Sequence, residues 1–196
     1  MNSLSKKLVL ASGSPRRKML LEAVGLRLIV RPVDVDETPL ADEAPEALAR
    51  RLALKKARAS SLAPQEVVLT ADTMVAFAGN LLGKPIDDDD AKRMLCMLSG
   101  REHEVWTAFC VRDEAHEEVH AVCTHVQFRE LHDDEINAYV ASGEPRDKAG
   151  AYGIQGGGGA LVEQARGSYP NVVGLPVKEV LSTLRAFGIA VGVVDE

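Results

Sequence analysis

The chain has 196 residues, 46% of them hydrophobic, so it can bury a substantial core, and we predict one domain spanning residues 1–196. Its formal net charge is −6 and only 4% of its residues are aromatic. These values argue against binding of nucleic-acid polymers, which usually requires a basic surface or stacking aromatic rings, but they leave room for a small anion held by a local basic cluster.

The first third of the chain alternates short apolar runs with helical patterns. Ser14-Pro15 has the form of a helix N-cap followed by proline at the first helical position, and Gly25 is a typical helix end. In the helix that starts at Pro45 we expect Lys56 on a basic surface. The predicted elements are a strand over residues 8–11, a helix over 15–24, a strand over 26–35 and a helix over 45–60.

The rest of the chain inserts antiparallel strands into this alternation. A continuous apolar run predicts a buried strand over residues 67–70. Residues 74–77 and 81–82, joined by the turn Gly79-Asn80, predict a hairpin. The remaining predicted elements are helices over 88–98, 133–141 and 176–187, strands over 104–112, 119–131 and 160–164, and a loop over 167–171. Asp87 is the expected N-cap of the first of these helices. The pattern indicates an α/β fold with a mixed, twisted central sheet flanked by helices.

The turn from the first strand into the first helix is a candidate phosphate site. Ser12 and Gly13 precede the helix start, where free backbone N–H groups and the helix dipole attract anions. Arg16 and Arg17 occupy the first turn, where the dipole disfavours cations, and a bound phosphate would account for them. The alternative is an ordinary capped helix with solvated arginines.

Two acidic segments are candidates for metal binding or proton transfer. Asp72 follows the apolar run Val67–Thr70, at the predicted carboxyl end of a buried strand, where α/β sheets place their ligands. Asp36 and Glu37 follow another predicted strand, and carboxylates from two strand ends can hold a hard cation such as Mg²⁺. A turn-capping Asp72 and a solvated acidic loop are the alternatives.

Two later segments carry weaker signals. Gly83-Lys84-Pro85 is not a Walker A loop, because its spacing is wrong and proline replaces the required Ser or Thr, so Lys84 alone favours a surface role. The segment from Asp147 to Gly156 is glycine-rich, and Gln155 offers an amide that suits the edge of a base. A binding loop and a flexible hairpin both fit this segment.

Taken in order, these motifs resemble the Maf family of nucleotide pyrophosphatases from about Leu8 to Phe187. The resemblance rests on Ala11-Ser12-Gly13-Ser14-Pro15-Arg16-Arg17, Asp36-Glu37, Ala71-Asp72-Thr73, Gly83-Lys84-Pro85, Leu98-Ser99-Gly100, Asp147–Gly156, Gly167-Ser168-Tyr169 and Val173-Gly174-Leu175-Pro176. Arg16, Thr73 and Gln155 match the dTTP/UTP subgroup of the family. The run Gly156–Gly159 is richer in glycine than the usual family pattern.

The resemblance implies a fold of two lobes around a cleft, often found as a homodimer. It also implies an enzyme that hydrolyses a nucleoside triphosphate to the monophosphate and pyrophosphate. Glu37 and Asp72 would hold Mg²⁺ or Mn²⁺, and Asp72 would also accept a proton from the attacking water. Thr73 and Gln155 would read a pyrimidine edge. The residues expected to contact the triphosphate are Ser12, Arg16, Lys56, Lys84 and Lys148, with Lys84 also catalytic. Arg17 and Asp147 are further expected substrate-binding residues.

Two other functions stay open at this point. One is a nucleotide-binding regulator of cell division that does not hydrolyse its ligand, and the other is a purine-preferring pyrophosphatase of the house-cleaning type. The three cysteines form no C-x-x-C pair, and we find neither a signal peptide nor an apolar run long enough to cross a bilayer. We therefore expect a cytoplasmic protein without a membrane partner.

Overall fold

The computed structural model describes residues 6–191, and its centre is one mixed sheet with the strand order β2-β1-β3-β5-β6-β7, with β4 paired to β3. β1 is parallel to β2 and β3, and the other pairings are antiparallel, which confirms the predicted mixed α/β fold. The strands are β1 (Lys7–Leu10), β2 (Leu28–Val30), β3 (Glu66–Phe77), β4 (Asn80–Leu82), β5 (Glu102–Arg112), β6 (Glu117–Phe128) and β7 (Val162–Arg166).

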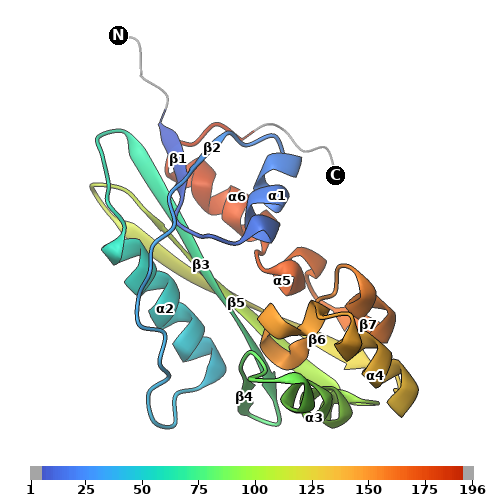
Figure 1. Ribbon diagram of the computed structural model, residues 1–196. Coiled ribbons are helices and arrows are strands. Elements are labelled where there is room, and N and C mark those ends of the chain that lie inside the picture. The colour runs from blue at the N-terminus through green and yellow to red at the C-terminus, as the bar shows by residue number, and fades with distance from the viewer. Residues whose placement is uncertain (1–5, 192–196) are drawn as a thin grey trace.

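The helices gather at the two ends of the long strands and along one side (Figure 1). α1 and α6 lie with β1 and β2 at one end, α3 and α4 lie with β4 and β7 at the other, and α2 packs on β3 and β5. The helices are α1 (Pro15–Ala23), α2 (Pro45–Ala59), α3 (Asp88–Leu98), α4 (Asp133–Ala141), α5 (Tyr169–Val173) and α6 (Val177–Ala186), with the 3-10 turns η1 (Glu144–Asp147), η2 (Ala149–Ala151) and η3 (Gly157–Leu161).

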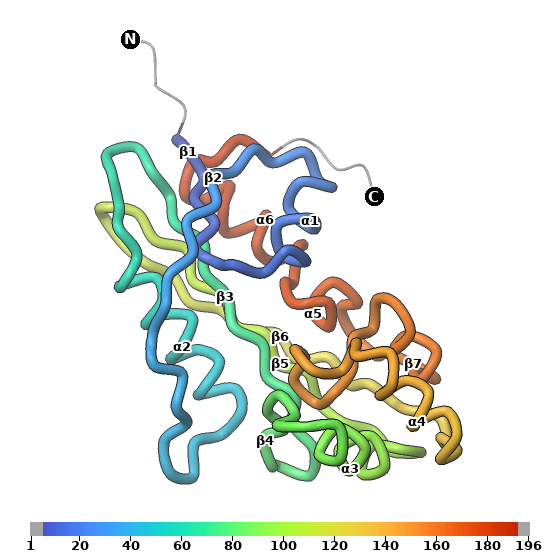
Figure 2. The backbone as a smooth tube through the Cα atoms, in the orientation of Figure 1, coloured from blue at the N-terminus to red at the C-terminus, as the bar shows by residue number. Residues whose placement is uncertain are grey.

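The apolar core divides in the same way, which gives the molecule two lobes. One buried cluster joins β1 to α1 and α6 through residues such as Leu10, Leu21 and Leu184. A second cluster joins α3 and α4 to the far ends of β3, β5 and β6, with Leu95 and Phe128 fully buried. The trace in Figure 2 shows β3, β5 and β6 passing from one lobe into the other. The lobes therefore share one rigid sheet.

The edge of β3 is open at the place where the lobes meet. Pairing with β1 ends at Leu10↔Leu69, and pairing with β4 begins at Val75↔Leu82, whereas β5 pairs with β3 along its other edge from Val68 to Ala76. Residues 70–74 thus have a strand neighbour on one side only. Asp72 lies in this gap and not at a strand end, so the prediction that the strand stops before it was wrong.

Several predicted boundaries are confirmed and others shift. Ser14 caps α1 and accepts a hydrogen bond from Arg17 N, and Asp87 caps α3, as expected. The strand expected over 26–35 is only Leu28–Val30, because β1 is itself short and offers no further partner. The strand expected over 160–164 begins at Val162, and Ser168 caps the short helix α5 where we expected a loop. Among helices of residues 6–191, none has the length and apolar character needed to span a bilayer.

Candidate active site

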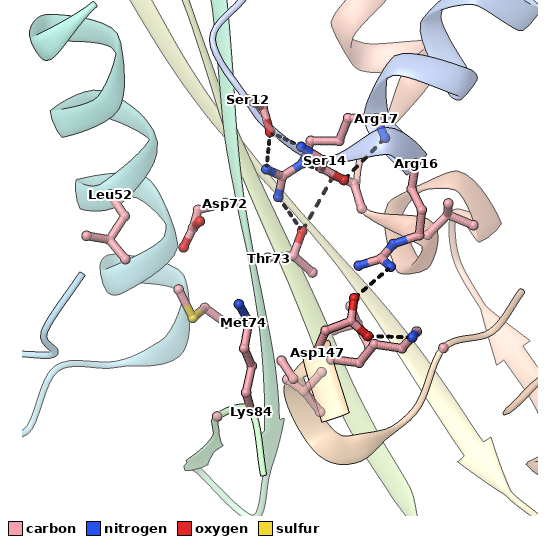
Figure 3. A pocket seen from close by; sticks show the side chains of 18 of the residues that line it. Ser12, Ser14, Arg16, Arg17, Leu52, Asp72, Thr73, Met74, Lys84 and Asp147 are labelled. Atoms are coloured by element: carbon pink, nitrogen blue, oxygen red, sulfur yellow. Dashed lines mark hydrogen bonds and ion pairs between the residues drawn. The ribbon is translucent and has the colours of Figure 1, made fainter. Parts of the chain in front are cut away.

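A cavity of about 880 Å³ lies beside the open edge of β3, between the two lobes. This volume falls within the range of small-molecule sites. Figure 3 shows the cavity from close by, with Asp72 and Leu52 on one side and Arg16 and Asp147 on the other. All the site residues predicted from the sequence line it, namely Ser12, Arg16, Arg17, Glu37, Lys56, Asp72, Thr73, Lys84, Asp147, Lys148 and Gln155.

Two carboxylates meet on one lysine in this cavity. Lys56 Nζ lies 2.5 Å from Asp72 Oδ1 and 2.6 Å from Glu37 Oε1, so residues far apart in sequence come together. Lys56 and Asp72 are only 8% and 7% exposed. The prediction that Lys56 belongs to a surface face of its helix was therefore wrong. Its side chain lies on the face of α2 that packs on β3, where the ion pair with Asp72 offsets the cost of burial.

The surroundings of Asp72 favour proton uptake. Burial raises the pKa of this carboxyl above its ordinary value, and the nearby charges of Lys56 and Arg17 counteract only part of that effect. A buried carboxyl with a raised pKa, open to a cavity, is the usual form of a general base.

Arg17 joins α1 to β3 and to the segment after α5. Its guanidinium donates to Ser12 Oγ at 3.0 Å, to Thr73 Oγ1 at 3.2 Å and to the Gly174 carbonyl at 2.9 Å. Burial lowers the pKa of Arg17. Three of its donors therefore bind protein acceptors, which holds the helix start against the open edge of β3.

The hydroxyl of Thr73 extends this network through residues that sequence analysis missed. Thr73 Oγ1 lies 2.9 Å from Thr107 Oγ1, which donates to the Asn171 carbonyl at 3.0 Å. Thr107 and Asn171 are fully buried. For Thr107 the only signal was a polar residue inside an apolar strand, and such a residue often has no role beyond satisfying its own hydrogen bonds. Asn171 lies in the short helix α5, which the sequence pattern did not predict.

A charged cluster joins the lobes on the opposite wall. Arg16 on α1 lies 3.9 Å from Asp147 Oδ2, and Lys148 Nζ lies 2.7 Å from Asp147 Oδ1. Lys84, which follows β4, points into the cavity in Figure 3 and has no ion-pair partner among residues 6–191. Arg16, Lys84 and Lys148 therefore surround the cavity with positive charge opposite the Asp72–Glu37 pair.

The segment around Gln155 completes the wall near Lys148. Gln155 is half-buried, and its amide makes no hydrogen bond to another residue in the described part of the chain. Ile154 precedes Gln155 in the chain, and Met74 and Leu81 also add apolar surface to the lining of the cavity. An amide next to apolar side chains suits the edge and faces of a nucleobase.

Comparison with known proteins is decisive for the family. The model of the Maf-like protein family matches residues 7–187, which is most of the chain. This chain belongs to the Maf family. Relatives named dTTP/UTP pyrophosphatase include proteins of Anaeromyxobacter dehalogenans strain 2CP-1, 53% identical over 94% of this chain and 96% of that protein, and of Myxococcus xanthus, 50% identical over 96% of each.

Solved structures support the fold of this Maf protein. A HAM1 protein from Coxiella burnetii aligns with a TM-score of 0.52 at 16% identity, over 93% of this chain and 99% of that one. The Ham1 protein of Staphylococcus aureus gives a TM-score of 0.50 at 15% identity, over 93% and 97%. At such low identity the likeness concerns the fold alone.

Proposed function

We propose that this chain is a nucleoside triphosphate pyrophosphatase that hydrolyses dTTP and UTP to the monophosphate and pyrophosphate. Relatives that are about half identical over nearly their whole length carry this activity in their names. The observation that carries the proposal is the cavity itself, where a buried Asp72 with a raised pKa faces Arg16, Lys84 and Lys148. This arrangement fits a nucleoside triphosphate whose α-phosphorus lies beside Asp72, the proposed general base.

In the proposed reaction, a water oxygen bonds to the α-phosphorus while the bond from that phosphorus to the α–β bridging oxygen breaks. Asp72 takes the proton that the water gives up, and the bridging oxygen leaves with the pyrophosphate. Because Asp72 is buried and its carboxylate pairs with Lys56, it is held in one place, and little solvent has to reorganise around it during the reaction.

The cations of the cavity have a separate task in this reaction. Negative charge develops on the departing pyrophosphate, and positive groups already in position stabilise it more than they stabilise the bound substrate. Arg16 comes from one lobe and Lys84 and Lys148 come from the other. We therefore assign these three residues to the triphosphate, together with Ser12 at the start of α1.

A divalent cation fits the two carboxylates. Glu37 and Asp72 present hard oxygen donors around the positive Lys56 Nζ. Within residues 6–191, no three His, Cys, Asp or Glu side chains form a metal site, so further ligands would have to come from the triphosphate and water, as is common for Mg²⁺. Such an ion, Mg²⁺ or Mn²⁺, would polarise the phosphate and lower the pKa of a bound water.

Gln155 is our candidate for recognition of the pyrimidine edge. Its amide can donate and accept, which matches the neighbouring N–H and C=O groups of thymine and uracil. The hydroxyl of Thr73 contacts Arg17 and Thr107, so we assign Thr73 to holding the floor of the pocket as well as to contact with the base. A pocket built to hydrogen-bond one edge rejects a base that lacks it.

A nucleotide panel with product identification tests the proposal. Purified protein is given dTTP, UTP, CTP and GTP at equal concentration with Mg²⁺ or Mn²⁺, and the products are separated. Monophosphate and pyrophosphate from dTTP and UTP support the proposal. Binding without hydrolysis would favour a nucleotide-sensing regulator, and a preference for GTP would favour a purine enzyme.

The homodimer stays a prediction. Light scattering on the same sample measures the oligomeric state.

A further inference from the structure

The segment of residues 153–158, with Gln155 at its centre, is bound at both ends by two side chains from outside it. Gly153 N donates to Tyr139 Oη at 3.2 Å, and the Tyr139 hydroxyl donates to Glu144 Oε1 at 3.0 Å. The other end of the segment donates to the same carboxylate, from Gly157 N to Oε2 at 3.0 Å and from Gly158 N to Oε1 at 3.3 Å. Tyr139 lies in the last turn of α4 and Glu144 begins η1, so both come from the lobe that carries Lys84.

This arrangement explains the run of glycines that exceeds the family pattern. A Cβ on Gly158 would lie 2.3 Å from the Gly153 carbonyl oxygen and 2.6 Å from Tyr139 Oη. A Cβ on Gly156 would lie 3.0 Å from Glu144 Oε2, and the φ of Gly156 is +86°, a conformation that favours glycine. The glycines thus let the backbone close around the carboxylate, so the run is fixed in place and is not a flexible hairpin.

Glu144 also reaches the phosphate side of the cavity. Its backbone carbonyl accepts a hydrogen bond from Lys148 Nζ at 2.5 Å. Tyr139 is 8% exposed, and burial raises the pKa of its phenol, so the hydroxyl stays protonated and can donate to Glu144. One residue therefore contacts both Lys148 and the segment that presents Gln155.

We propose that Glu144 and Tyr139 are positioning residues for nucleobase selection, which fix the backbone of residues 153–158 so that the Gln155 amide meets the base edge in one orientation. This inference rests on the proposed function for its activity readout. Neither side chain lines the cavity, so both act through Gln155 and not by contact with the substrate. Discrimination between bases depends on fixed geometry, and a mobile amide would accept several edges.

The test compares Tyr139→Phe, Glu144→Gln and Glu144→Asp with Glu163→Gln. Glu163 is exposed on β7, and its side chain makes no hydrogen bond or ion pair with another described residue, so it is a matched control. The measurements are kcat and KM for dTTP and CTP, hydrogen exchange of the amides of residues 153–158, and the melting temperature. Tyr139→Phe removes one hydroxyl group, so it tests the proposal even if the Glu144 variants fold poorly.

We expect the ratio of kcat/KM for dTTP to that for CTP to fall about tenfold in Glu144→Gln and about threefold in Tyr139→Phe, with a smaller change in kcat for dTTP. Exchange at Gly153, Gly157 and Gly158 should accelerate in both. Glu144→Asp keeps the charge but loses reach, so it should behave like Glu144→Gln, and Glu163→Gln should match the wild type.

An unchanged dTTP/CTP ratio in all three variants would overturn the inference, as would an equal loss for both nucleotides or a wild-type ratio in Glu144→Asp. Failure of the proposed function looks different, because the wild type would then release no pyrophosphate from any nucleotide. In that case hydrogen exchange would still test whether Tyr139 and Glu144 fix the backbone of residues 153–158. Wild-type exchange rates in the variants would overturn this part of the inference.

Discussion

At the scale of single residues, Asp72 is subject to opposing influences. Burial raises its pKa, whereas Lys56, 2.5 Å away, favours the ionised form. The net direction is upward, so Asp72 takes up a proton more readily than an exposed aspartate. Since a protonated carboxyl cannot accept the proton of a water, activity should fall as the pH drops through this raised pKa.

Replacement of Asp72 by Asn should separate chemistry from folding. The amide keeps the shape of the side chain, and Lys56 retains Glu37 as a partner, so we expect the protein to fold with a melting temperature close to that of the wild type. Pyrophosphate release from dTTP should fall by about 10³-fold or more, as is typical for loss of a general base. Asp34→Asn is the control, because Asp34 is exposed and does not line the cavity. Turnover at the wild-type rate in Asp72→Asn would show that Asp72 is not the general base.

His103 should give the folded state a measurable sensitivity to acid. It is 2% exposed on β5, and burial lowers its pKa from the ordinary 6.5 to about 4. Between these values the unfolded chain binds a proton that the folded protein does not, so stability is full above pH 6.5 and declines as the pH falls toward 4. Between pH 7.5 and pH 5 the wild type should lose about 2 kcal/mol more than His103→Gln.

Urea unfolding of both proteins at the two pH values measures this difference. Tyr152, whose hydroxyl lies 2.8 Å from His103 Nε2, also lines the cavity, so His103 supports one wall of the site. Parallel loss of stability in the two proteins would mean that His103 takes up its proton without cost.

At the scale of elements, the open edge of β3 creates the site. Sequence analysis predicted the caps and the helices well, because Ser14-Pro15 and Asp87 act within one turn of the chain. It broke the strand at Asp72, because the continuity of β3 between Thr70 and Met74 depends on pairing with β5, which lies far along the chain. Local pattern cannot report a partner that only the folded sheet supplies.

The same limit applied to the candidate site. The residues singled out by their motifs all line the cavity, including Glu37 from the loop before α2 and Asp72 from β3. Tyr139 and Glu144 were missed because each looks like an ordinary residue at the end of a helix, and only the return of residues 153–158 onto them gives them a task. The residues that support a site come from packing, which a motif does not describe.

Gly150 links the loops that carry two of the cavity lysines. Its N–H donates to the Gly83 carbonyl, next to Lys84, and Lys148 lies two residues before it. Its φ is +70°, and a Cβ there would lie 2.8 Å from Val75 Cγ1. Gly150→Ala therefore introduces both an unfavourable conformation and a clash with the core, and it should displace both lysines.

We expect Gly150→Ala to lower the free energy of unfolding by about 2 kcal/mol or more and to raise KM for dTTP. Gly143→Ala is the matched control, because its φ of +75° is similar but nothing lies within 4 Å of the added Cβ. Gly143→Ala should lower the free energy of unfolding by about 1 kcal/mol and leave KM for dTTP unchanged. Chemical denaturation and steady-state kinetics of the two variants test this, and equal costs would show that the contact with Val75 is harmless.

At the scale of the whole molecule, the charge of the cavity is opposite in sign to the net charge of the chain. The chain carries −6 overall, yet the cavity is lined by five cations and three carboxylates. The cations come from both lobes, whereas Glu37 and Asp72 lie together on the side of α2 and β3. A triphosphate can bridge these groups, because its oxygens can bind Arg16, Lys84 and Lys148 while also ligating a cation held by the carboxylates.

The division of ligands predicts that the metal and the nucleotide bind as a pair. Two carboxylates that already share Lys56 should hold Mn²⁺ only weakly when no triphosphate supplies further oxygens. With the non-hydrolysable analogue α,β-methylene-dTTP, the rise in melting temperature should be larger with Mn²⁺ than the sum of the rises that the analogue and Mn²⁺ give separately. EDTA should abolish the excess, and Glu37→Gln should reduce it. Additive shifts in the wild type would mean that the cation and the triphosphate occupy independent sites, and the carboxylate pair would then have no part in gripping the substrate.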